Sequence, residues 1–271
     1  MMRGLLTKTL HEVWLPTLLF GCALLVVNVL LTHVLPQIQQ GLGGMFDHLP
    51  FMRSMLTALL GTELGDEITA RTMQAFLWVH PVVLALVWAH EITLCTRMPA
   101  GEIDRGTIDV LLGLPVSRRA VYVCESIVWL VSGVLILAMG LLGHRIAAPA
   151  MPEEMRPELL RAGLVMANLY GVYVAVGGIA FLVSALSDRR GRAMAIVFGI
   201  VLASFLLNFV AQFWEPAKQL AFLGVMEYYQ PAQILQSGNF PIGDLAILLL
   251  VGGSTWLLGG EIVARRSICT V

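Results

Sequence analysis

The residues with the clearest chemical potential form one charged segment between two long apolar runs. Positions 102–109 carry three acidic side chains and one arginine, and two further arginines follow at 118 and 119. Ile108, Leu111 and Leu112 are spaced by three and four residues, so they would share one face of a short helix. Arg105 and Asp109 lie four residues apart and can support each other on the exposed side. An apolar ridge bordered by charges indicates a protein-binding surface rather than a catalytic site.

Helix-breaking residues mark both ends of this segment. Pro99 and Gly101 interrupt the helix that precedes it, and Gly113 and Pro115 end it. Ser117 can cap the next helix, whose first two arginines are expected at the inner membrane surface. The residues alone are also consistent with an ordinary interfacial helix.

Motifs of several enzyme classes are absent from the sequence. Neither Lys8 nor Lys218, the two lysines, follows the glycine pattern of a phosphate-binding loop, so ATP would have to be bound by another chain. His90-Glu91 begins a zinc-protease motif, but Leu94 stands where the second histidine is required. No Gly-x-Ser-x-Gly sequence occurs, and the histidines, cysteines and methionines lack metal-ligand spacing. We therefore expect no catalytic residue, metal or cofactor in this chain.

The composition is that of a membrane protein. Apolar residues make up 58% of the chain, charged residues 13%, and mean hydropathy is +0.81. Soluble domains carry about 25% charged residues, so this chain has too little polar surface for one. The net charge of −1 gives no electrostatic case for binding nucleic acid.

Six apolar runs are long enough to cross a bilayer, which takes about 20 residues in a helix. Lipid offers the backbone no hydrogen-bond partners, so the spans must be helical. The sequence therefore predicts an all-α polytopic membrane protein with one transmembrane domain over residues 1–271. The predicted spans are Val13–Leu35, Met73–Leu94, Val121–Leu142, Leu159–Leu186, Ala193–Phe213 and Leu245–Val263.

The distribution of lysine and arginine predicts the orientation. Eleven of the 17 lie at one set of span ends, and the short loop 188–192 alone carries three arginines. Cytoplasmic loops are enriched in these residues, so we expect both termini in the cytoplasm.

Two of the opposite, external connections are expected to hold interfacial helices. Glu215–Asp244 contains three prolines and is less apolar than a span, which predicts short re-entrant or interfacial helices. Pro36–Thr72 carries an apolar stripe at helical spacing, typical of a helix lying in the membrane surface. The stripe consists of Met52, Met55, Leu56, Leu59 and Leu60.

Polar residues inside spans either line a pathway or join helices by hydrogen bonds. Glu91, Glu125 and Glu261 are placed at cytoplasmic span ends, where we expect them to be solvated or paired with arginines. The candidates for lining a pathway are Asn28, Asn168, Tyr173, Asn208 and Gln212.

The charged segment resembles the cytoplasmic loop by which permeases of the ATP-binding-cassette type-2 exporter family meet their ATPase. In that family the loop has the form Glu-x-x-x-Gly-Thr, an acidic-leucine stretch, then Pro-Val-Ser-Arg. Residues 228–238 and the last span are similar to the family's external hairpin and final helix. Glu125 departs from relatives, which often carry a basic residue there. The residues that match the loop are Glu102, Gly106, Thr107, Asp109, Leu111, Leu112, Pro115, Val116, Ser117 and Arg118.

The resemblance implies a permease subunit of the bacterial inner membrane. A second permease, identical or closely homologous, would complete the pathway, and separate ATPase subunits would bind ATP and magnesium. The transported substrate stays open, and the alternative is an ATP-independent channel, scaffold or ion-driven carrier. The residues that the resemblance assigns to ATPase coupling are Glu102, Arg105, Gly106, Thr107, Ile108, Asp109, Leu111, Leu112, Pro115 and Arg118.

Overall fold

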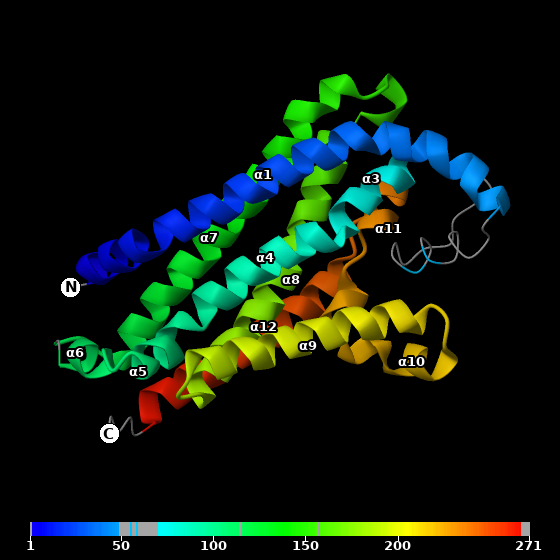
Figure 1. The fold of residues 1–271 in the computed structure, drawn as a ribbon. Coiled ribbons are helices and arrows are strands. Elements are labelled where there is room, and N and C mark those ends of the chain that lie inside the picture. Colours follow the sequence, from blue (N-terminus) through cyan, green and yellow to red (C-terminus); the bar gives the residue numbers. More distant parts are fainter. Residues whose placement is uncertain are drawn as a thin grey trace.

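A computed structural model gives the fold. It describes residues 2–48, 70–113, 115–156 and 158–266, together with Met55 and Ala58, with side chains except at positions 2, 40, 42–48, 70–72, 111 and 112. The described residues form helices and no strands, and six helical stretches are long and apolar enough to cross a membrane, as predicted. The helices run side by side in one elongated bundle, with both termini at the same end (Figure 1).

The first half of the chain supplies three of the six spans. They are α1 (Met2–His48), the pair α3 (Ala70–Val79) and α4 (Pro81–Cys95), and α7 (Arg118–Ala147). The π-helical turn η1 (Arg97–Gly101) and two short helices, α5 (Glu102–Asp104) and α6 (Ile108–Leu112), connect α4 to α7. Two 3₁₀ turns follow α7, η2 (Ala148–Ala150) and η3 (Glu153–Met155).

The second half supplies the other three spans, α8 (Leu159–Leu186), α9 (Arg190–Ala211) and α12 (Ile242–Arg265). Between α9 and α12 lie α10 (Glu215–Leu220), the 3₁₀ turns η4 (Ala221–Leu223) and η5 (Val225–Tyr228), and α11 (Pro231–Ser237). This succession of short helices is what the three prolines of the connection predict.

Two spans differ from their predicted extents. The first helix continues past the predicted end at Leu35 and runs to His48, across Pro36. Proline costs a helix one hydrogen bond but can be carried where packing compensates, and Leu35 is buried against Met73, Met151 and Met155. The second span is two helices, because Pro81 starts α4 and the His80 side chain caps it.

The predicted interfacial stripe between α1 and α3 lies almost wholly outside the described residues. This applies to Met52, Leu56, Leu59 and Leu60.

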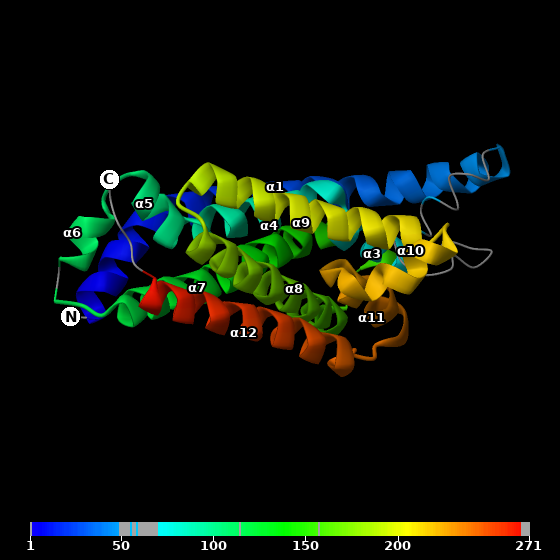
Figure 2. The ribbon, with the colours of Figure 1, turned by 90° about the horizontal axis from the view of Figure 1, so that it is seen from below.

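Glycines allow the spans to approach closely. A Cβ on Gly178 of α8 would lie 2.2 Å from the carbonyl oxygen of Gly252 on α12, and one on Gly143 of α7 would lie 2.3 Å from the carbonyl oxygen of Leu25 on α1. Small residues let helix backbones meet in lipid, where the hydrophobic effect does not drive packing. Gly252 itself also lies close to α8, since a Cβ on it would be 2.5 Å from the Val174 carbonyl oxygen. The helix α8 runs through the middle of the bundle, in contact with α4, α7, α9 and α12 (Figure 2).

Candidate functional site

The predicted coupling segment lies at the end of the bundle that holds both termini (Figure 1). It begins with η1, whose five residues are all buried. The Ala100 backbone N–H donates to Ser184 Oγ on α8 at 3.2 Å. The segment is therefore joined to the bundle where it leaves α4, and only its distal part projects.

Glu102 organises the turn that follows. Its carboxylate accepts hydrogen bonds from Arg105 Nη2 at 2.6 Å and from the Thr107 hydroxyl, and the Glu102 carbonyl accepts the Thr107 N–H at 3.0 Å. Gly106 supplies the left-handed residue of this turn, with φ at +68°, a conformation that costs a residue with a Cβ about 1–2 kcal/mol. The Glu-x-x-x-Gly-Thr pattern thus encodes a loop shape.

The structure places Ile108 differently from the prediction. Its side chain is 0% exposed and belongs to the main hydrophobic core, so it anchors α6 to its own chain instead of facing a partner. Val110, by contrast, is 74% exposed, and Asp109 is exposed beside it. The side chains of Leu111 and Leu112 lie outside the described residues, so their outward contact stays a prediction.

The start of α7 is built as the sequence predicts, with one difference. Ser117 Oγ accepts the Ala120 N–H at 3.1 Å and caps the helix. Arg118 donates to the Arg266 carbonyl at 2.5 Å, and Arg119 pairs with Glu261 at 2.9 Å. Both arginines therefore hold the end of α12, a contact that the sequence analysis did not foresee.

A buried ionic network joins the base of the coupling segment to α1 and α7. Arg97 pairs with Glu125 through Nη2 and Oε1 at 2.6 Å, and its Nη1 pairs with Glu12. The Thr9 hydroxyl donates to the same Glu125 oxygen at 2.9 Å, and Lys8 lies 3.6 Å from Glu12. Burial alone would lower the pKa of Arg97, but the carboxylates of Glu125 and Glu12 outweigh it and raise that pKa above its ordinary value.

The expectations for the three span-end glutamates divide. Glu125 pairs with Arg97, and Glu261 pairs with Arg119 and Arg265, as expected. Glu91 is wrong, because it is 0% exposed and neither carboxylate oxygen has a hydrogen-bond partner among the described residues. Glu91 does lie one turn before the span ends at Cys95, but the chain stays buried from Leu94 through η1, so its carboxyl is shielded from solvent.

The predicted pathway residues do not converge on one site. Asn168 donates to the Tyr228 carbonyl and accepts the Gln230 N–H, and Asn208 donates to Glu227, so both hold the 215–241 connection to its spans. Asn28 donates to its own helix, at the Leu24 carbonyl.

The other two pathway candidates differ in burial. Tyr173 is buried, lies 3.4 Å from His90 Nδ1 and donates to the Trp129 carbonyl at 3.3 Å. Gln212 is exposed just after α9. The pathway role of all five residues stays a prediction.

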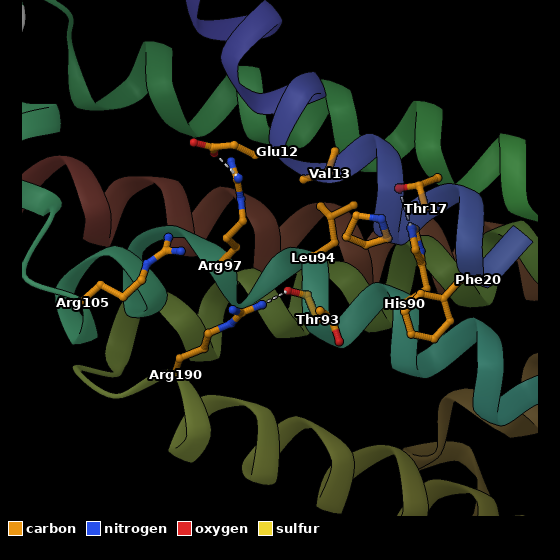
Figure 3. Close-up of a pocket in the computed structure, with 11 residues that line it drawn as sticks. Glu12, Val13, Thr17, Phe20, His90, Thr93, Leu94, Arg97, Arg105 and Arg190 are labelled. Atoms are coloured by element: carbon orange, nitrogen blue, oxygen red, sulfur yellow. Dashed lines mark hydrogen bonds and ion pairs between the residues drawn. The ribbon is translucent and has the colours of Figure 1, made fainter.

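Two features escaped the sequence analysis. One is the extent of the Arg97 network: the pairing of Glu125 with an arginine was expected, but the contacts with Glu12 and Thr9 of α1 were not. The other is a cavity of about 430 Å³ between α1 and α4 at the same end of the bundle (Figure 3). An acidic residue at 12, an arginine at 97 and a glutamate at 125 are too far apart in sequence to signal a contact. In the sequence, the signal for polar residues inside the bundle was the pair His90-Glu91 within an apolar run.

The family comparison agrees with this arrangement. The family model described as ABC-2 family transporter protein matches residues 13–239, from α1 through α11. The chain belongs to this family. A search of curated proteins returned no match. The permease is thus a multi-pass transmembrane component of a transporter, and such components are distinct from the ATPase.

Proposed function

We propose that this permease is one half of the translocation pathway of an ATP-driven exporter and couples to a separate ATPase subunit through the coupling segment, residues 97–119. The observation that carries the proposal is the shape of that segment. Its base is fixed to α1, α7 and α8 by Arg97 and Ala100, while Val110 projects into solvent. A rigid base with an exposed apolar tip can pass a partner's movement to the spans.

A second permease subunit completes the pathway in this proposal. Within the chain, only 28% of the most apolar stretch of α1 and 22% of that of α9 are buried. Leu19 and Leu30 on α1 and Phe198 on α9 are among the exposed apolar side chains. These surfaces suit contact with lipid and with another copy or a close homologue. ATP and magnesium are then bound by the ATPase chains.

The excess of arginine at the end that carries the coupling segment supports a cytoplasmic location for that end and for both termini. A location in the bacterial inner membrane is proposed on the ground of the family resemblance. Export, rather than import, is proposed on the same ground.

Co-purification tests the coupling. We expect Val110→Asp combined with Leu112→Asp to release the ATPase, because each buried apolar side chain contributes about 1.5–3 kcal/mol and a buried carboxylate adds a penalty. The matched control is Leu223→Asp, which changes an apolar residue of similar exposure at the other end of the bundle. A double variant that inserts normally and still retains the ATPase and transport would refute the proposed coupling.

A further inference from the structure

The cavity between α1 and α4 has its basic side chains at one end (Figure 3). Three arginines, at positions 97, 105 and 190, lie toward the coupling segment. Phe20 of α1 lies deeper in the bundle, beside Thr17 and His90, whose side chains are 3.2 Å apart and hydrogen-bonded to each other. Leu94 of α4 lies between the two ends. One end of this cavity therefore carries the guanidinium groups, with Glu12 beside Arg97, and Leu94 and Phe20 give the rest an apolar surface next to the Thr17–His90 hydrogen bond.

The three arginines are not equally neutralised. Arg97 is paired with Glu12 and Glu125, and Arg105 is paired with Glu102. Arg190 donates Nη2 to the Thr93 carbonyl at 2.8 Å, its Nε is buried without a partner, and no carboxylate of the described residues forms an ion pair with its guanidinium. Asp104 instead accepts the backbone N–H of Arg190, at 3.4 Å.

The Arg190 guanidinium therefore has no ion-pair partner among the described residues, although the carboxylates of Asp104 and Glu102 act on its charge from farther away. Arg97 and Arg105 are near enough to Arg190 to act on its charge. The Arg105 side chain is 53% exposed, so its guanidinium can turn toward a ligand. Guanidinium groups bind phosphate through paired, charge-assisted hydrogen bonds, and a tetrahedral phosphate can accept from two of them at once.

We propose that this cavity binds a phosphate-bearing amphiphile, with the phosphate on Arg105 and Arg190 and the alkyl chain along Leu94 and Phe20. Its volume of about 430 Å³ lies within the usual range for small-molecule sites, about 300–1,000 Å³. The inference rests on the proposed function, because it makes the amphiphile the cargo at the point where it enters the pathway.

Calorimetric titration of the purified permease alone, in a neutral detergent, tests this site. The probes are dioctanoyl phosphatidic acid, dioctanoylglycerol with the same chains but no phosphate, and inorganic phosphate. We expect the phosphatidic acid to bind at least about tenfold more tightly than either of the others. Arg190→Gln and Arg105→Gln should each weaken its binding about tenfold or more, one hydrogen-bonded charge contact being worth about that much.

The matched control is Arg192→Gln, an exposed arginine two residues along α9 that does not line the cavity. It should bind phosphatidic acid as the unaltered permease does. Arg190→Lys keeps the charge and should retain more affinity than Arg190→Gln. If Arg190→Gln does not fold, the exposed Arg105→Gln decides the matter.

Unchanged binding in the variants at 105 and 190 would overturn the site. Equal binding of dioctanoylglycerol would remove the role of the phosphate, and equal binding of inorganic phosphate would remove that of the chain. No ATPase is present in this titration. A permease that binds phosphatidic acid but never associates with an ATPase would refute the proposed function and leave the site standing.

Discussion

Glu102 is a charged residue of the coupling segment that serves its own loop. Its carboxylate binds Arg105 and Thr107, and Gly106 provides the left-handed turn that returns Thr107 to it. Exposed charges at this segment's surface would be free to meet a partner, but Glu102 is buried. The family pattern at these positions thus preserves a shape, and recognition of a partner falls to the residues beyond it.

The Arg97–Glu125 pair yields a stability prediction. Removing one partner of a buried ion pair leaves an uncompensated charge and costs about 3–5 kcal/mol. Glu125→Gln should therefore lower the melting temperature of the purified permease strongly, toward the lower end of that cost because Glu12 still binds Arg97. Arg97→Met combined with Glu125→Leu should recover most of the loss.

The exposed Arg119–Glu261 pair serves as the control for this comparison. Surface pairs contribute about 0–1 kcal/mol, so Arg119→Gln should change the melting temperature little. Equal effects of Glu125→Gln and Arg119→Gln on the melting temperature would contradict a buried pair. So would a double variant, Arg97→Met with Glu125→Leu, whose loss of stability equals the sum of the losses from its two single changes.

Sequence could predict some of these residue roles and not others. The cap formed by Ser117 depends on local spacing and was predicted. The burial of Ile108 was not, because an amphipathic pattern shows that one face is apolar but not what covers it. The burial of Glu91 near the end of its span was also missed, because the buried π turn that continues the chain after Cys95 has no periodic signature.

At the scale of elements, close contacts between spans depend on individual glycines. Gly252 and Gly253 are neighbours on α12, yet a Cβ at 252 would lie 2.5 Å from the Val174 carbonyl oxygen of α8, while one at 253 would meet nothing within 4 Å. One glycine is therefore required for the contact between helices and the other is not.

These two glycines provide a matched test of the α8–α12 contact. Gly252→Ala should force the helices apart and destabilise the permease by about 1–3 kcal/mol, as overpacking generally does. Gly253→Ala should be neutral, or slightly stabilising through the better helix propensity of alanine. Thermal melting of the two purified variants measures the difference, and equal melting temperatures would show that α8 and α12 are not packed as described.

The six spans were predictable because length and hydropathy alone decide whether a helix can cross a bilayer. The residues at which the spans end were harder to predict. From the local sequence, Pro36 predicts the end of a helix. The packing of Leu35 against Met73 and Met155 nevertheless lets α1 continue to His48. Such compensation is tertiary and cannot be read from the segment itself. The division of the second span at His80 was available from Pro81.

At the scale of the whole molecule, both termini and the coupling segment share one end of the bundle (Figure 1). We proposed from the charge bias that this end lies in the cytoplasm. In a variant without native cysteines, Glu153→Cys should react with a membrane-impermeant maleimide in intact cells, whereas Arg189→Cys should react only after permeabilisation. Labelling of position 189 in intact cells, with 153 protected, would reverse the orientation and remove the coupling segment from the cytoplasm.

The central claim is that the tip of the coupling segment touches an ATPase. The most direct measurement replaces Val110 with a photo-crosslinking amino acid in native membranes, with the same replacement at Leu223 as the control, and identifies the product by mass spectrometry. We predict a covalent product between permease and ATPase at position 110 and none at 223. Position 110 yielding only lipid or permease products, in membranes that contain the ATPase, would contradict the proposed coupling.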